Sequence, residues 1–162
     1  MTFAELKAHI HNCLQPLYPK SEINSFYFIL LQHYGNYATA DVLANADTLL
    51  TDNIKQSIQQ AITELQTAKP IQYILGETEF FSNRFFVDEN VLIPRPETEE
   101  LVDWVLQTYS DKTYPLHILD IGTGSGCIAV SLAKALPEAQ VTAIDISPKA
   151  IAVAQRNAKR NG

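Results

Sequence analysis

The sequence predicts an α/β protein in three parts: an N-terminal helical bundle, a β-hairpin, and a unit in which strands and helices alternate. Apolar residues recur at three- and four-residue spacing through residues 1–75, which is typical of helices that bury one face. Two strand-like runs with a short break lie between residues 76 and 91. From residue 92 onward, a helical pattern comes first, and then apolar runs that end at glycine or aspartate alternate with further helical patterns.

Three long apolar stripes define the main helices expected in residues 1–75, and each stripe can bury one face of a bundle. Ser21 and Thr51 are the expected N-caps, and Thr39 is expected to open a shorter helix. Pro70 is placed to begin a last turn that Gly76 ends. The stripes are Phe3, Leu6, Ile10, Leu14 and Leu17; Ile23, Phe26, Tyr27, Leu30 and Tyr34; and Ile54, Ile58, Ile62 and Leu65. At this spacing, the aromatic run 26–28 is expected to be core rather than a binding surface.

The hairpin is expected to pair residues 79–81 with residues 84–87 through a turn at Ser82-Asn83. Two prolines then force an extended path, and Pro96 is placed to begin a helix with acidic residues in its first turn. Residues 111–115 are expected to form the loop into the next strand.

Five residues form a glycine turn between an apolar strand pattern at 118–121 and a helical pattern at 128–136. They are Gly122, Thr123, Gly124, Ser125 and Gly126. Because glycine lacks a Cβ and tolerates positive φ, such a turn lets a small anionic or zwitterionic ligand approach backbone N–H groups at a helix N-terminus. A dinucleotide-binding turn would place its third glycine at position 127, where this chain has Cys127. A nicotinamide-dependent oxidoreductase is therefore disfavoured.

A second acidic residue, Asp145, ends the next apolar run, nineteen residues after Gly126. A carboxylate at the carboxyl end of a strand is placed to accept two hydrogen bonds from ribose hydroxyls. Ser147 and Pro148 follow as the expected N-cap and first residue of another helix. The form D-x-G-x-G-x-G, which begins at Asp120, resembles the first motif of S-adenosylmethionine-dependent methyltransferases with a Rossmann-like fold.

Composition excludes some classes of function. The 162 residues carry a net charge of −6, and the absence of a Lys/Arg cluster disfavours nonspecific nucleic-acid binding. Cys13 and Cys127 match no metal-ligand spacing and are expected to be reduced thiols. His9 and His11 would point in different directions on a helix, so no metal site is expected. No signal-peptide core or membrane-length apolar stretch occurs, which leads us to expect a cytoplasmic protein without membrane contact.

Four segments resemble one family, the glutamine methyltransferases that modify class-1 peptide-chain release factors (the HemK/PrmC group). They are the helical N-terminal segment, P-I-Q-Y-I-L-G with the following E-F-F, L-I-P-R-P-E-T-E-E-L, and I-L-D-I-G-T-G-S-G-C-I-A. The resemblance implies a helical substrate-recognition domain at 1–75, a β-hairpin linker at 76–91, and the first half of a Rossmann-like methyltransferase domain at 92–162. The implied reaction moves the methyl group of S-adenosylmethionine to the side-chain amide of the glutamine in a Gly-Gly-Gln motif.

The same resemblance implies a role for each site residue. Residues 122–126 would approach the methionine portion of the cofactor, Asp120 would orient the turn or the bound amino group, and Asp145 would hold the ribose. A segment with Arg95, Glu97 and Thr98 either lies near the mouth of the active site or serves as a proline-stiffened link. Three other charged residues are expected to be solvated: Arg84 on the hairpin, and Glu99 and Asp103 on the helix.

The family's N-P-P-Y motif does not occur in these 162 residues. In the family, its asparagine side chain and a proline carbonyl orient the target amide, and positioning of this kind supplies a large part of catalysis. We therefore expect a truncated form with no catalytic residue of its own and no efficient transfer. Two alternatives stay open: a methyltransferase for a glutamine of a large-subunit ribosomal protein, and a non-catalytic module that binds release factors.

Overall fold

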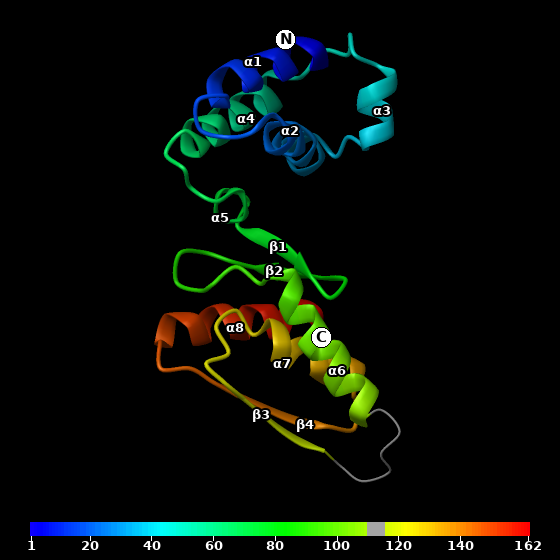
Figure 1. Ribbon diagram of the computed structural model, residues 1–162, viewed down its shortest axis with the longest axis vertical. Coiled ribbons are helices and arrows are strands. Elements are labelled where there is room, and N and C mark those ends of the chain that lie inside the picture. Colours follow the sequence, from blue (N-terminus) through cyan, green and yellow to red (C-terminus); the bar gives the residue numbers. More distant parts are fainter. Residues whose placement is uncertain (110–115) are drawn as a thin grey trace. The chain divides into compact units, whose positions relative to one another are not determined.

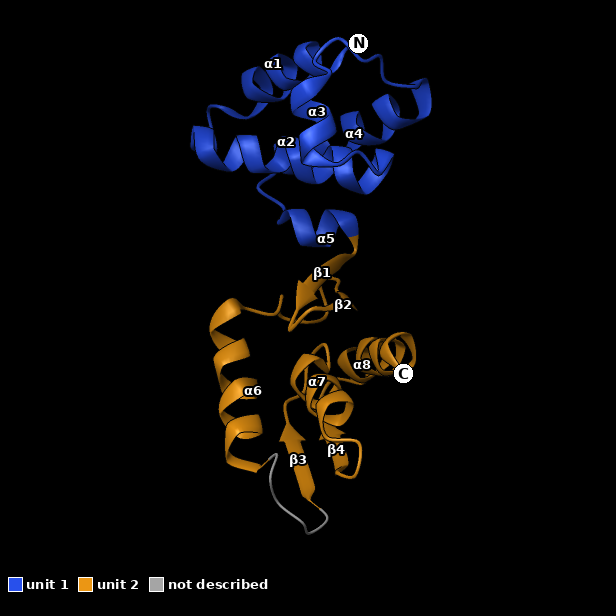
Figure 2. Ribbon diagram, turned by 90° about the vertical axis from the view of Figure 1, so that its right-hand side faces the viewer, with its two compact units in different colours: residues 1–75 blue, residues 76–162 orange. Residues whose placement is uncertain are grey.

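The computed structural model describes residues 1–109 and 116–162, and Figure 1 shows the order of the elements. The chain divides into two compact units, Met1–Leu75 and Gly76–Gly162 (Figure 2). The predicted α/β class, with a helical N-terminal region, is confirmed. The loop predicted at 111–115 lies outside the described residues. No helix within the described ranges is long and apolar enough to cross a membrane.

The first unit consists of helices around one apolar core. They are α1 (Phe3–Leu14), α2 (Lys20–Gly35), α3 (Thr39–Ala44), α4 (Asp52–Leu65) and α5 (Ile71–Leu75). The predicted stripes supply most of the buried side chains, and Phe26 and Tyr27 are buried in the core with Phe28 packed against it. The expectation that the aromatic run is core is thus confirmed. Leu17 is an exception, because α1 ends at Leu14 and leaves the Leu17 side chain 53% exposed.

The helix starts follow local backbone geometry. Thr2 caps α1 in a capping box, because its side chain accepts from the Glu5 N–H while Glu5 accepts from the Thr2 N–H. The expected cap at Ser21 is wrong, since the extended Pro19 is the N-cap and α2 already begins at Lys20. Thr51 does occupy the N-cap of α4, although its side chain makes no capping hydrogen bond. The predicted last turn after Pro70 is present as α5.

In the second unit, an antiparallel hairpin joins β1 (Glu77–Phe80) to β2 (Asn83–Phe86). The turn consists of Phe81 and Ser82, with φ of 47° and 57°, rather than the predicted Ser82-Asn83. Two positive φ values are typical of the type I′ turn, which matches the twist of the strands but normally uses glycine or asparagine. The turn residues therefore carry no sequence signal of their conformation.

The rest of the second unit is a β-α-β-α arrangement preceded by a helix. Its elements are α6 (Pro96–Tyr109), β3 (His117–Ile121), α7 (Cys127–Ala135), β4 (Gln140–Ile144) and α8 (Pro148–Asn161). The two strands are parallel, with Ile121 opposite Ile144 at their carboxyl ends. Helix α7 packs against α6 on one side and α8 on the other (Figure 2). As predicted, Pro96 begins α6, and Ser147 caps α8 by accepting from the Ala150 N–H.

Candidate cofactor site

The glycine turn connects the carboxyl end of β3 to the N-terminus of α7. Gly122, Gly124 and Gly126 have φ of 78°, 54° and 79°, in the left-handed region that side chains disfavour. The N–H groups of Gly122 and Thr123 donate to the Ile144 carbonyl at 2.8 and 3.0 Å. The turn is therefore tied to the end of the neighbouring strand, where ligands bind in open α/β sheets.

The three glycines differ in the space around them. A Cβ added at Gly122 or Gly124 would meet no atom within 4 Å, so both leave the backbone open to a ligand. A Cβ at Gly126 would lie 3.1 Å from the Ala154 Cβ and 3.2 Å from its Cα. Gly126 therefore permits the close approach of α7 and α8, which is a packing role. The space at the first two glycines leaves room for a cofactor at this turn. The N–H groups of Gly122, Thr123 and Gly124, however, already donate to Ile144 and Asp145, so the N–H groups expected to face a ligand are occupied at these three residues.

Asp120 holds the turn from the strand side. The Thr123 hydroxyl donates to Asp120 Oδ2 at 2.7 Å, and the Thr123 side chain is buried. The carboxylate at the end of β3 thus holds the side chain of the second residue of the turn.

Asp145 holds the same turn from the other strand. It follows β4 directly, where its Oδ2 accepts from the Gly124 N–H at 2.9 Å and its Oδ1 accepts from the Ser147 N–H at 2.9 Å. These bonds, first from Ser147 and then from Gly124, hold the pKa of Asp145 below its ordinary value, so the carboxylate is ionised at neutral pH. Each carboxylate oxygen has a further lone pair, which leaves capacity for ligand hydroxyls.

The other predicted residues have different surroundings. Arg84 is largely exposed and pairs with Glu77 at 2.9 Å, as expected of a hairpin surface charge. Arg95 and Glu97 are also exposed, and the Thr98 N–H donates to the Arg95 carbonyl at the start of α6. Within the described residues, no side-chain hydrogen bond links these three to the glycine turn.

The expectation that Glu99 is solvated is wrong. Its Oε1 accepts from the Phe81 N–H at 2.8 Å, and the side chain is half-buried. Because the hairpin turn folds back on α6, Glu99 caps that turn. Asp103, one helical turn further along, is exposed as predicted.

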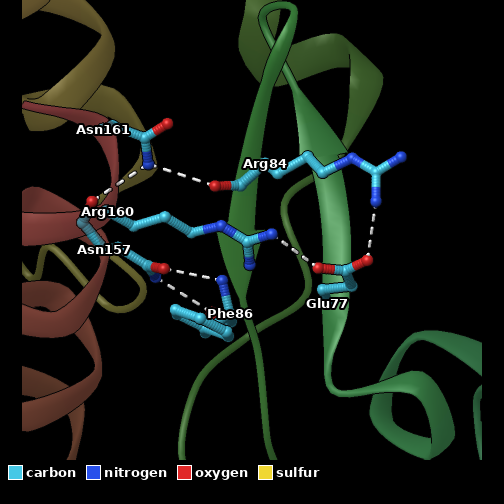
Figure 3. Close-up of polar contacts among 6 residues, drawn as sticks. All are labelled: Glu77, Arg84, Phe86, Asn157, Arg160 and Asn161. Atoms are coloured by element: carbon cyan, nitrogen blue, oxygen red, sulfur yellow. Dashed lines mark hydrogen bonds and ion pairs between the residues drawn. The ribbon is translucent and has the colours of Figure 1, made fainter.

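Sequence reasoning missed Asn157, which is fully buried on α8. Its side chain bonds the backbone of Phe86 in β2 (Figure 3). It also donates to the carbonyl of Ser125 in the glycine turn. One signal existed, since Asn157 continues the buried face that Ala150, Val153 and Ala154 form at helical spacing. A polar residue in such a stripe indicates a specific buried hydrogen bond.

Cys127 directly follows the glycine turn and is buried. Burial raises the pKa of the Cys127 thiol, so Cys127 is a protonated core residue at the start of α7. No cluster of His, Cys, Asp or Glu in the described part of the chain has the geometry to hold a metal ion.

Comparison with known proteins identifies the parts of this fold. Residues 113–162 match a family model described as a methyltransferase domain, and residues 6–76 match one described as the PrmC N-terminal domain. The glycine turn and its two aspartates therefore lie in a domain of the methyltransferase class.

The relatives of this chain show to which family of methyltransferases it belongs. A release factor glutamine methyltransferase of Flavobacterium psychrophilum is 46% identical over 99% of this chain and 57% of its own length. The proteins of the same name from Bacteroides thetaiotaomicron and Escherichia coli are 41% and 40% identical, over 94% and 81% of this chain and 54% and 47% of their own lengths. The chain belongs to the release factor glutamine methyltransferase family. It spans about half the length of the curated relatives it matches.

Proposed function

We propose that the protein containing these residues transfers the methyl group of S-adenosylmethionine to the glutamine side-chain amide of the Gly-Gly-Gln motif in class-1 release factors. This proposal rests on the structure of the glycine turn. The turn has open space at Gly122 and Gly124, and it is hydrogen-bonded to Asp120 and Asp145 at the carboxyl ends of β3 and β4. The names of the relatives support the substrate, since each is called a release factor glutamine methyltransferase.

In this proposal, the backbone at Gly122, Thr123 and Gly124 receives the methionine portion of the cofactor. The space above Gly122 and Gly124 supports that placement, because a ligand there reaches the backbone without meeting a side chain. Ser125 and Gly126 form the rest of the glycine turn. S-adenosylmethionine supplies a methyl group on a positively charged sulfur, and the protein's task is to bind and orient it.

Asp145 is proposed to accept hydrogen bonds from the ribose hydroxyls. Its place directly after β4, beside the glycine turn, supports this role, since a carboxylate accepts stronger hydrogen bonds than a neutral group. The same carboxylate already holds Gly124 and Ser147, so ribose binding and turn geometry depend on one residue.

The helical unit, residues 1–75, is proposed to recognise the release factor. Its match to the PrmC N-terminal domain supports a family-specific role. Orientation of the target amide is assigned, by resemblance, to an N-P-P-Y motif, which these 162 residues do not contain. We therefore expect residues 1–162 alone to transfer no methyl group.

Substrate competition tests this proposal. The full-length protein is given labelled S-adenosylmethionine with equal amounts of an unmodified class-1 release factor and a large-subunit ribosomal protein. We expect label on the release factor, and none when its Gly-Gly-Gln glutamine is replaced by alanine. Label mainly on the ribosomal protein would overturn the substrate assignment alone, and no label on either would overturn methyl transfer.

A further inference from the structure

The Asn157 side chain connects two segments that lie far apart in the sequence. Its Oδ1 accepts from the Phe86 N–H at 2.6 Å, and its Nδ2 donates to the Phe86 carbonyl at 2.9 Å (Figure 3). This paired bond occupies both backbone groups of one strand residue, as a neighbouring strand would. The same Nδ2 donates to the Ser125 carbonyl at 2.8 Å. Asn157 thus joins β2 to the glycine turn.

The contact with Ser125 fixes one peptide of the turn. The peptide between Ser125 and Gly126 has its carbonyl bonded to Asn157 and its N–H bonded to the Thr123 carbonyl at 2.8 Å. Both of its polar groups are therefore satisfied inside the protein, and the Ser125 residue is only 2% exposed. With this peptide held inward, the backbone at Gly122 and Gly124 is left facing open space.

Close packing of α8 makes this reach possible. Ala154, one helical turn before Asn157, lies so close to Gly126 that a Cβ there would be 3.1 Å from the Ala154 Cβ, a tight contact. A larger residue at either position would move α8 away from the turn, and the amide of Asn157 would no longer reach the Ser125 carbonyl. The packing of Gly126 on Ala154 and the hydrogen bond from Asn157 therefore act together on the end of the glycine turn.

Other contacts hold the hairpin against α8 and do not involve the glycine turn. Asn161 Nδ2 donates to the Arg84 carbonyl at 3.1 Å, and Arg160 pairs with Glu77 at 2.8 Å (Figure 3). The guanidinium groups of Arg156 and Arg160 lie 4.5 and 4.3 Å from the centre of the Phe86 ring. Asn161 is the natural control for Asn157, because it has the same side chain one turn later. Among the residues that the structure describes, it bonds the hairpin and its own helix but not the glycine turn.

We propose that Asn157 is a positioning residue for cofactor binding, which holds the Ser125 peptide so that the glycine turn keeps its open face toward the ligand. This inference rests on the proposed function of the turn as an S-adenosylmethionine site. Asn157 acts through the backbone of the turn and is not proposed to touch the cofactor. Loss of its two donated hydrogen bonds leaves the buried Ser125 carbonyl and the partly buried Phe86 carbonyl without that partner, and such a loss favours rearrangement of the turn.

The test compares Asn157→Ala, Asn157→Leu and the control Asn161→Ala in the full-length protein. Two readouts are needed: the dissociation constant of S-adenosylmethionine by calorimetry, and hydrogen exchange of residues 122–127, both at a temperature where each variant is folded. We expect both Asn157 variants to weaken binding by about tenfold or more and to speed exchange in the turn. Asn161→Ala should speed exchange only in the hairpin and leave the dissociation constant within about twofold.

Three outcomes are decisive. If the Asn157 variants lower the melting temperature but leave both the dissociation constant and exchange of the turn unchanged, Asn157 is merely structural and the inference is overturned. If Asn157→Ala does not fold, Asn157→Leu decides the question, since it has nearly the same shape, loses both donated bonds and places no charge beside the two carbonyls. If the unmodified protein does not bind S-adenosylmethionine, the proposed function fails, and the exchange measurement alone decides whether Asn157 positions the turn.

Discussion

The Gly124 N–H donates to Asp145 Oδ2 at 2.9 Å, which ties the turn after β3 to the carboxylate that follows β4. The two residues are 21 positions apart in the sequence, yet their contact gives the candidate site its shape. A carboxylate that was expected only to bind a ribose therefore also organises the protein around it.

Asp145 makes the stability of this region depend on pH. Because its pKa is lower in the folded protein than the ordinary value of about 3.9, the carboxylate stabilises the fold above that value. This contribution is lost as pH falls through the lower, folded pKa. We expect the melting temperature of the unmodified protein to exceed that of Asp145→Asn at pH 6, with a difference that shrinks below about pH 4. A difference that stays constant down to pH 2.5 would contradict this account.

Gly124 and Gly126 should respond differently to alanine. Gly124→Ala adds a side chain in open space at positive φ, and we expect a loss of about 1 kcal/mol in unfolding free energy. Gly126→Ala adds the same backbone strain and a tight contact with Ala154, for a loss of about 2–3 kcal/mol. Urea unfolding measures both values. Equal losses would mean that Gly126 has no packing role.

Removal of the Glu99 carboxylate should loosen the hairpin turn. Glu99→Ala leaves the Phe81 N–H without its acceptor, and we expect a loss of about 1–2 kcal/mol in unfolding free energy. Glu99→Gln keeps an acceptor oxygen at the same place and should lose less than half of that. Asp103→Ala on the same helix is exposed and serves as the control. If Glu99→Ala is as harmless as the control, the contact with Phe81 does not stabilise the turn.

Residues 1–75 should fold as a separate polypeptide. Their apolar core is built from side chains within the unit itself, from Phe3 to Ile71. Circular dichroism of this polypeptide should have a strong helical signal and a cooperative thermal transition. A spectrum typical of coil, or gradual melting, would show that the unit depends on the rest of the chain.

Local signals explain what the sequence could predict. Three signals act within a few residues of the helix they begin: the glycine spacing, the proline at the start of α6, and the Ser147-Pro148 pair. The predicted starts of α6, α7 and α8 therefore lie close to the observed ones. The predicted hairpin turn, Ser82-Asn83, lies one residue after the observed turn, Phe81-Ser82. The reason is that Phe81 and Ser82 adopt positive φ, which normally requires glycine or asparagine.

Contacts between distant residues explain the rest. Glu99 and Phe81 are 18 residues apart, and Asn157 lies 71 residues from Phe86 and 32 from Ser125. No pattern among neighbouring residues of the sequence predicts contacts between residues so far apart. A polar residue in the buried stripe of α8 was the only hint for Asn157, and nothing in the sequence showed which backbone groups it would bind.

The central claim, that the glycine turn and Asp145 form an S-adenosylmethionine site, is tested most directly by calorimetric titration of the full-length protein and its variants. Asp145→Ala should weaken binding of S-adenosylmethionine by roughly ten- to a hundredfold, because it removes charge-assisted hydrogen bonds. Gly124→Val should be at least as harmful, since it fills the open face of the turn. The unmodified protein should bind S-adenosylmethionine in preference to a nicotinamide dinucleotide. Unchanged affinity in both variants would contradict the site.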